Sequence, residues 1–213
     1  SVKRVLAAFP THYPRHILEQ AAVKPTKRDP KAPVRIIWSG RIQTEKRPLE
    51  FIQAFALANP DATAELYGKG YQFKKAAKLI KELGLEHKVH LRGSVPYTTM
   101  LRRFAEADVL AQTSVGFETQ GMTVYEAAAV GTPSILCDHN IAGEFATDVH
   151  WTVRDESVEA LAESIAKAVA DIKAGDNRGE RLKNEDHLLQ TGATAKMLKY
   201  YASVIEAHKA KSY

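Results

Sequence analysis

The sequence predicts an α/β fold with a doubly wound, mostly parallel sheet, on two observations. Short runs of β-branched and apolar residues recur from residue 34 onward, and segments with apolar residues at helical spacing lie between them. Strands joined through helices in this way run parallel, and the helices cover both faces of the sheet. We find no internal repeat and no low-complexity segment.

The bounds of the individual elements follow from these short apolar runs and from the helical spacing of apolar residues between them. Strands are predicted at residues 34–38, 62–67, 89–91, 109–112, 134–137 and 149–153. Helices with one apolar face are predicted at residues 49–58, 97–107, 124–130 and 157–172, and a last one at about 194–209. Ser157 suits the N-cap of its helix, because its hydroxyl can accept a hydrogen bond from a first-turn N–H group.

Composition excludes several classes of protein. The chain has 213 residues, 45% hydrophobic and 26% charged, which fits one domain with appendages. Its net charge of +5 is mild, so it permits an anionic ligand without demanding nucleic acid. A single cysteine, Cys137, excludes a disulfide framework and a multi-cysteine zinc site, and we expect it to be buried. His12 and His16 are the only histidines four apart, and Pro14 lies between them, so we expect no metal site.

The chain divides into three predicted parts. Residues 1–33 hold five of the nine prolines, so we predict a linker or remnant there. Residues 34–175 form the predicted domain, and residues 176–213 a carboxy-terminal helical tail. No apolar run approaches the roughly 18 residues of a membrane span and no signal peptide is evident, so the expected location is the cytoplasm.

Ligands of open parallel sheets bind beyond the carboxyl ends of the strands, so the segments that follow the predicted strands are informative. Glycines and basic residues follow the first three strands, while polar loops with carboxylates follow the fourth and fifth. These segments are residues 40–46, 68–70, 92–94, 114–123 and 138–144. Glycines let backbone N–H groups approach, Arg and Lys neutralise phosphate, and carboxylates accept hydrogen bonds from hydroxyls. The edge therefore suits a ligand with both phosphate and hydroxyl groups.

Plainer interpretations stay open for each feature. The helix start at residues 121–123 could hold a phosphate through its unpaired N–H groups, or be an ordinary loop-to-helix junction. Glu126, inside an apolar helix, could meet ribose hydroxyls or pair with a lysine. Arg41 and Lys46 could clamp a phosphate or be surface charges. The glycines at 68 and 70 fit a tight turn, and His139 a non-catalytic loop.

Several motifs occur together and in one order. They are Gly40-Arg41 with Glu45-Lys46, Tyr67-Gly68-Lys69-Gly70, Leu91-Arg92-Gly93-Ser94-Val95-Pro96, Ala107-Asp108-Val109, the spacing of Glu118 and Glu126, and Gly131-Thr132-Pro133. From about residue 34 to 172 the chain thus resembles the carboxy-terminal, nucleotide-sugar-binding, Rossmann-like domain of the retaining glycosyltransferases of family 4, which have the GT-B fold. Each motif alone is weak, but the set in register is specific.

The resemblance implies a role for each matching residue. Arg41 and Lys46 would hold and neutralise the donor diphosphate, and Glu118 would contact the donor sugar. These three are the expected catalytic residues. Glu126 would bind the ribose hydroxyls. The other residues expected to bind the nucleotide sugar are Gly40, Gly68, Gly93, Ser94, Val95, Gly121, Met122 and Thr123. The family needs no metal and no cofactor, and its donor is a UDP-sugar or a GDP-sugar.

Two departures from the family leave the sugar open. Thr119 and Gln120 stand where the family often has Gly-Phe, and the loop at 138–144 lacks the usual paired glycines. A third departure is length, because only 33 residues precede the first predicted strand. We therefore expect the donor-binding half of a hexosyltransferase of polysaccharide biosynthesis, with the amino-terminal acceptor domain absent from this chain.

The alternatives are a non-catalytic nucleotide-sugar-binding subunit and a nucleotide-sugar epimerase of the same fold. The acceptor would be a glycan or a lipid-linked saccharide at the inner face of the membrane, where the mild positive charge would support peripheral association weakly. Binding of nucleic acid is not expected, because the aromatic residues do not alternate with a basic stripe.

Overall fold

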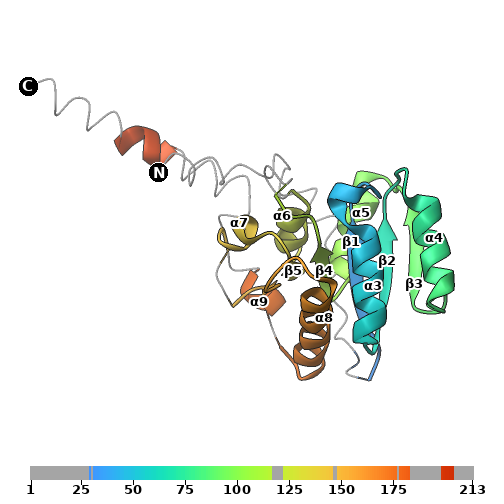
Figure 1. Ribbon diagram of the computed structural model, residues 1–213. Helices are drawn as coiled ribbons and strands as arrows, with labels where there is room; N and C mark the ends of the chain where they lie inside the picture. Colours follow the sequence, from blue (N-terminus) through green and yellow to red (C-terminus); the bar gives the residue numbers. More distant parts are fainter. Residues whose placement is uncertain are drawn as a thin grey trace, which may run out of the picture.

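The computed structural model describes residues 29, 31–116, 122–145, 148–176, 178–182 and 198–203. Within these ranges six strands form one parallel sheet in the order β3-β2-β1-β4-β5-β6 (Figure 1). The strands are β1 (Val34–Ser39), β2 (Ala62–Tyr67), β3 (Val89–Gly93), β4 (Val109–Gln112), β5 (Ser134–Leu136) and β6 (Trp151–Thr152). The predicted α/β fold with a doubly wound parallel sheet is confirmed.

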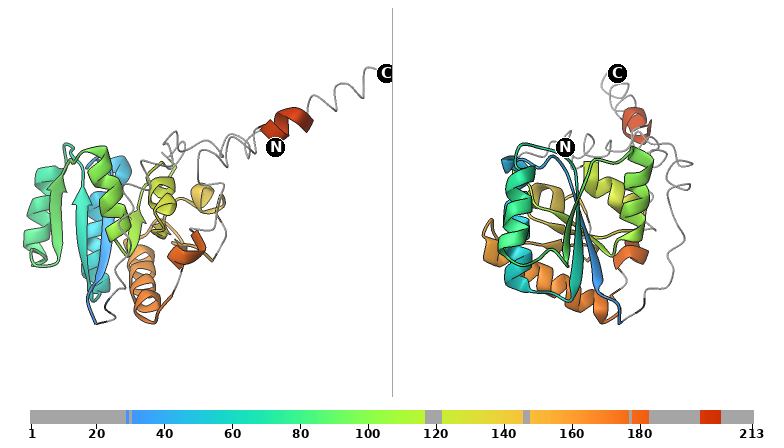
Figure 2. Two further views of the ribbon diagram at one scale, coloured as in Figure 1. Left: turned by 180° about the vertical axis from the view of Figure 1, so that it is seen from behind. Right: turned by 90° about the vertical axis from the view of Figure 1, so that its right-hand side faces the viewer.

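Helices cover both faces of this sheet (Figure 2). They are α3 (Pro48–Ala58), α4 (Phe73–Glu82), α5 (Tyr97–Glu106), α6 (Met122–Ala129), α7 (His139–Ala142), α8 (Val158–Lys173) and α9 (Arg178–Leu182), with a 3-10 helix η1 (Thr44–Lys46). One core lies between the sheet and α3, α4 and α8, and a second between the sheet and α5, α6, α7 and α9. None of the helices within the described ranges is long and apolar enough to cross a bilayer.

The strand order places a topological switch point between β1 and β4. The chain runs from β1 outward to β3, then returns to β4 on the other side of β1 and continues to β6. The connections that leave β1 and β4 therefore lead to helices on opposite faces of the sheet. A crevice opens where two such connections part, and open α/β sheets bind their ligands there.

Some elements differ from the predicted ones. Helix α4 was not predicted. Four of its ten residues are lysines and only Ala76 and Ile80 are buried, so its sequence shows little apolar periodicity. Strand β6 is shorter than the predicted segment at 149–153, because only Trp151 and Thr152 pair with β5. Within the predicted last helix the structure describes residues 198–203, which are helical.

Part of the predicted carboxy-terminal tail packs on the domain. Leu182 of α9 is 3% exposed and belongs to the second core. A Cβ at Gly179 would collide with the carbonyl oxygen of Gly131, so α9 lies directly on the turn between α6 and β5. Residues 178–182 thus extend the packed body beyond the predicted boundary at 175.

Candidate functional site

The loops that follow β1 and β2 are joined beyond the end of the sheet. Gly40 N donates to Tyr67 O at 3.0 Å, and Ile42 N donates to Lys69 O at 2.9 Å. Gly68 has φ +142°, and a Cβ there would collide with the carbonyl oxygen of Gly40. Gly68 is thus required for the close approach of two backbones, which fixes the loop carrying Arg41 next to that carrying Lys69.

An open cavity of about 520 Å³ lies beyond the carboxyl ends of β1, β2 and β3. We call it the nucleoside-sized cavity. Its lining residues come from the three strand ends and from the start of α5: Ser39, Gly40, Arg41, Tyr67, Gly68, Lys69, Ser94, Val95, Tyr97 and Met100. Its volume lies within the usual range for small-molecule sites, and its lining mixes apolar rings with a few polar groups. Five predicted site residues, Gly40, Arg41, Gly68, Ser94 and Val95, meet here.

Gly93 lies directly beside this cavity without forming its lining. It adopts φ +71° at the end of β3, and its carbonyl oxygen accepts a hydrogen bond of 2.8 Å from Gly68 N. The positive φ turns the chain into the segment that carries Ser94 and Val95.

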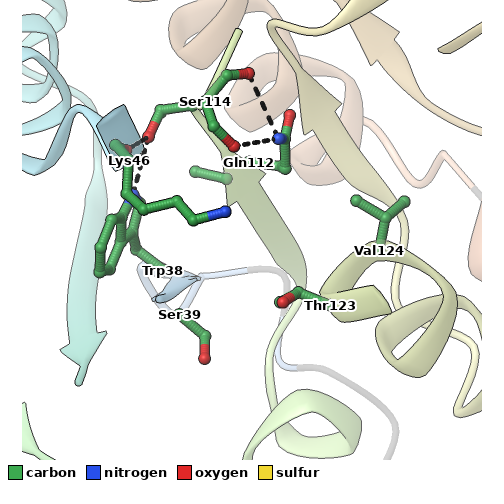
Figure 3. A pocket seen from close by; sticks show the side chains of 9 residues that line it. Trp38, Ser39, Lys46, Gln112, Ser114, Thr123 and Val124 are labelled. Carbon is green, nitrogen blue, oxygen red and sulfur yellow. Dashed lines mark hydrogen bonds between the residues drawn. The ribbon is translucent and has the colours of Figure 1, made fainter. Parts of the chain in front are cut away.

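A second, much smaller cavity of about 10 Å³, room for a single water molecule, lies at the switch point (Figure 3), and we call it the switch-point cavity. It is lined by the ends of β1 and β4, by Lys46 and by the first turn of α6: Trp38, Ser39, Lys46, Ala111, Gln112, Thr113, Ser114, Thr123 and Val124. The side chain of Lys46 extends across this space toward the side of the crevice formed by α6 (Figure 3). Lys46 and Thr123, which are 77 residues apart in the sequence, therefore line the same cavity.

Hydrogen bonds fix the main chain of Lys46. The hydroxyl of Thr113 donates to Lys46 O at 2.6 Å, and Trp38 Nε1 donates to that hydroxyl at 2.8 Å (Figure 3). The next residue, Arg47, adopts the left-handed region at φ 54°, which costs a non-glycine residue roughly 1 kcal/mol. Its guanidinium donates to the carbonyl oxygens of Thr113, at 3.5 Å, and of Glu156. The sequence analysis did not identify the three residues that support Lys46, which are Trp38, Arg47 and Thr113.

Arg41 lies at the mouth of the site. Its guanidinium is 3.2 Å from the carboxylate of Glu45, and its side chain is 67% exposed. Arg41 and Lys46 also line a third, open cavity of about 680 Å³ around η1 and the start of α3. Both cations therefore stand between neighbouring cavities, where a diphosphate could reach them.

The predicted residues around α6 are described in part. Met122, Thr123 and Glu126 are half-buried in this helix, with Glu126 one turn after Thr123. Two predicted site residues, Glu118 and Gly121, lie outside the described residues. Backbone N–H groups of the first turn of α6 have no intrahelical acceptor, as at any helix start, and they lie next to the switch-point cavity.

The loop after β5 is closed by Asp138. This residue is 2% exposed, and its carboxylate accepts hydrogen bonds from Asn140 N at 2.9 Å, Ile141 N at 3.3 Å and Gly116 N at 3.0 Å. These N–H groups are therefore engaged within the chain. The preference of Asp for N-caps was the available signal for this arrangement. In the same loop, His139 Nε2 lies 2.7 Å from Val153 O.

Two buried groups near the carboxyl ends of the strands have shifted pKa values. Burial raises the pKa of the Cys137 thiol to about 12, so the thiol stays protonated and does not act as a nucleophile. Burial and the hydrogen bond to Glu65 raise the pKa of Tyr67, which lines the nucleoside-sized cavity, to about 12. The expectation that Cys137 is buried is confirmed. In the part of the chain that the structure describes, no three His, Cys, Asp or Glu residues gather as a metal site.

Comparisons with known proteins agree with this fold. The model of the family described as "Glycosyl transferases group 1" matches residues 20–185. The chain is 31% identical over 114 residues to the GtfA subunit of the UDP-N-acetylglucosamine–peptide N-acetylglucosaminyltransferase of Streptococcus gordonii, a match covering 52% of this chain and 22% of that protein. It is 29% identical over 125 residues to the lipopolysaccharide 1,6-galactosyltransferase of Salmonella typhimurium, covering 57% of this chain and 34% of that protein.

Among solved structures, HepE from Anabaena in complex with UDP and glucose superposes with a TM-score of 0.69. The sequence identity is 17%, and the match covers 90% of this chain and 55% of HepE. At this identity the likeness concerns the fold alone. The chain spans about a fifth to a third of the length of the curated relatives that it matches.

Proposed function

Because the chain belongs to the glycosyl transferases group 1 family, we propose that it binds the nucleoside-diphosphate sugar of a retaining, metal-independent hexosyltransferase. The observation that carries the proposal is the position of Lys46 in the switch-point cavity, opposite the first turn of α6 and beside the nucleoside-sized cavity. A base and ribose fit the larger cavity, and the diphosphate would then lie at the mouth of the switch-point cavity, which at about 10 Å³ is too small to enclose it.

The charges at the switch point suit the departure of a diphosphate. When the bond between the anomeric carbon and the β-phosphate oxygen breaks, the electron pair of that bond stays on the phosphate. Lys46, Arg41 and the N–H groups of Met122 and Thr123 would stabilise this developing negative charge. Because the start of α6 and the main chain of Lys46 are held in place before the reaction, these groups can fulfil the role that a divalent cation has in other transferases.

The two glutamates complete the proposed site. Glu126, half-buried on α6, would accept hydrogen bonds from the ribose hydroxyls, and Glu118 would contact the hydroxyls of the donor sugar. Asp138 occupies two N–H groups after β5, those of Asn140 and Ile141, so we propose that this loop contacts the sugar through side chains more than through its backbone.

The whole enzyme would also need a site for the acceptor. We propose that an amino-terminal domain outside this chain supplies it, and that the acceptor is a glycan or a lipid-linked saccharide of polysaccharide biosynthesis at the cytoplasmic face of a membrane. The partial coverage of the curated relatives supports a larger whole protein.

Calorimetric titration with UDP, GDP and ADP, each with an excess of the chelator EDTA, tests the donor proposal. We expect one diphosphate, UDP in the first place, to bind in EDTA, because Lys46, Arg41 and α6 replace a metal. Adding Mg²⁺ should change the affinity by less than about threefold, since no metal-ligand set takes part. Binding that appears only with Mg²⁺, or no binding of any diphosphate, would contradict the proposal.

A further inference from the structure

Helix α4 carries a row of lysines on its solvent side. Lys74, Lys75, Lys78 and Lys81 are all exposed, while Ala76 and Ile80 pack into the core. Lys74, Lys78 and Lys81 are spaced four and three residues apart, which places them on one stripe of the helix. The stripe is about 10 Å long at the α-helical rise of 1.5 Å per residue.

This concentration of positive charge distinguishes α4 from the other described helices. Helix α4 holds four lysines against one carboxylate, Glu82, whereas the longer α8 holds two lysines against three carboxylates and α3 has no basic residue. Glu82 pairs with Lys78 at 3.3 Å, but both side chains are more than half exposed, so the pair is weak. Helix α4, with four lysines and one glutamate, therefore carries a local net charge of +3 on a single helix.

The position of α4 leaves its lysines accessible. Both views place the helix at the outer edge of the molecule, beside the edge strand β3 (Figures 1 and 2). Two exposed side chains with apolar bodies flank the lysine row, Tyr71 just before the helix at 69% exposure and Leu83 just after it at 41%. Lysines with such neighbours are typical of surfaces that lie at the boundary between water and lipid.

We propose that this lysine surface, formed by Lys74, Lys75, Lys78 and Lys81 with Tyr71 and Leu83, docks the protein on an anionic membrane. Each lysine near such a surface contributes about 1 kcal/mol through the negative potential of the lipid headgroups. Nucleic acid fits less well, because the surface offers the point charges of lysine without an arginine fork. Its one aromatic ring, Tyr71, is tied by its hydroxyl to Thr44, whereas stacking of successive bases uses several rings.

Docking through α4 brings the donor edge close to the lipid. The hydroxyl of Tyr71 contacts Thr44, at 3.0 Å from its N–H and 2.7 Å from its hydroxyl, and Thr44 lies in the same loop as Arg41 and Lys46. This inference deepens the membrane association proposed above, and it can succeed or fail independently of donor binding.

Co-sedimentation with vesicles tests the docking surface without any nucleotide. The 213-residue chain is mixed with vesicles of phosphatidylcholine alone or of phosphatidylcholine with phosphatidylglycerol, at low and at high salt. The test variant combines Lys74→Gln, Lys78→Gln and Lys81→Gln. A control variant of equal net charge combines Lys31→Gln, Arg102→Gln and Lys199→Gln, three exposed positions outside α4.

We expect binding to the phosphatidylglycerol vesicles only, weakened by salt. Each lysine should contribute about fivefold to the partition coefficient onto anionic vesicles. The partition coefficient of the test variant should therefore fall about a hundredfold, and that of the control variant much less. Both variants should keep the wild-type affinity for the nucleoside diphosphate, which shows that they fold. Equal binding by wild type and test variant, equal losses in both variants, or binding of polynucleotide with no binding of anionic vesicles would each overturn the proposal.

Discussion

The main chain of Lys46 is held by a threonine that lies 67 residues further along the chain. The hydroxyl of Thr113, which is 2% exposed, bridges Trp38 Nε1 and Lys46 O. The hydrogen bonds from the Arg47 guanidinium help to offset the cost of the left-handed backbone at that residue. The direction of the Lys46 side chain thus depends on buried groups that do not themselves need to touch a ligand.

Thr113→Val tests this positioning role. Valine has the same shape but leaves Trp38 Nε1 and Lys46 O without this partner, so we expect the affinity for the nucleoside diphosphate to fall about tenfold. Thr113→Ser, which restores the hydroxyl, should recover most of the affinity. Calorimetry on both variants measures this, with circular dichroism as the check of folding. A folded valine variant that binds as tightly as wild type would contradict the role.

Sequence reasoning finds residues at this scale only when their signal is local. The burial of Cys137 follows from the apolar run around it. The hydrogen bond from Trp38 to Thr113 joins residues 75 apart in the sequence. The sequence around a tryptophan in a strand does not indicate which distant group accepts its indole N–H. Asp138 could have been recognised as an N-cap, but its third hydrogen bond, from Gly116, depends on the path of a distant loop.

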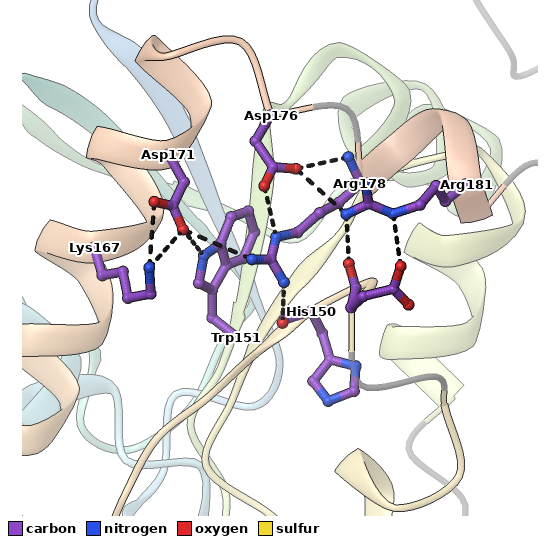
Figure 4. Close-up of polar contacts among 8 residues, drawn as sticks. His150, Trp151, Lys167, Asp171, Asp176, Arg178 and Arg181 are labelled. Carbon is purple, nitrogen blue, oxygen red and sulfur yellow. Dashed lines mark hydrogen bonds and ion pairs between the residues drawn. The ribbon is translucent and has the colours of Figure 1, made fainter.

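At the scale of elements, a polar network fastens α9 to the domain (Figure 4). The guanidinium of Arg178 stacks 4.2 Å from the ring of Trp151 and donates to His150 O at 2.6 Å and to Asp176 at 3.1 Å. Asp171 of α8 accepts from Trp151 Nε1 at 2.9 Å. The network links β6, α8 and α9, so the segment after residue 176 contributes to the stability of the sheet edge.

Arg178→Met should therefore destabilise the domain. The Arg178 side chain is only 15% exposed, and its loss removes several charged hydrogen bonds and the contact with Trp151, so we expect about 2–3 kcal/mol less unfolding free energy. Urea denaturation measures the change. Arg154→Met is the matched control, because Arg154 pairs with Asp155 and Glu163 at the surface, and it should unfold like wild type. Equal stability of the two variants would contradict a structural role for the network.

The elements themselves were largely predictable, for a physical reason. Buried parallel strands are apolar on both faces, and β4 and the middle of β1 show this as continuous runs, whereas β2 alternates buried and half-buried residues. Helix α4 escaped prediction because it covers the outer end of the sheet, where only a narrow apolar stripe is needed beside its lysines. Short α7 and α9 depend on caps and tertiary contacts, which have no periodic signal.

At the scale of the whole molecule, the sheet order brings the site together. The segments that follow β1, β2 and β3 meet at one cavity, and those that follow β1 and β4 meet at the switch point with α6. The convergence was predictable because parallel strands place their carboxyl ends at one edge. The division into two adjoining cavities depends on side-chain volumes and loop paths, which no periodic pattern records.

The most direct measurement compares a nucleoside diphosphate with its monophosphate, UDP and UMP, by calorimetry on wild type, Lys46→Ala and Val95→Trp. Lys46→Ala should lower the affinity for UDP about 10- to 100-fold, which corresponds to the loss of one charged hydrogen bond. The affinity for UMP should change little, because Lys46 contacts the terminal phosphate. Val95→Trp should weaken both ligands, since it fills the nucleoside-sized cavity. Unchanged UDP binding in both variants would contradict the placement of the base in the nucleoside-sized cavity and of the diphosphate at the mouth of the switch-point cavity.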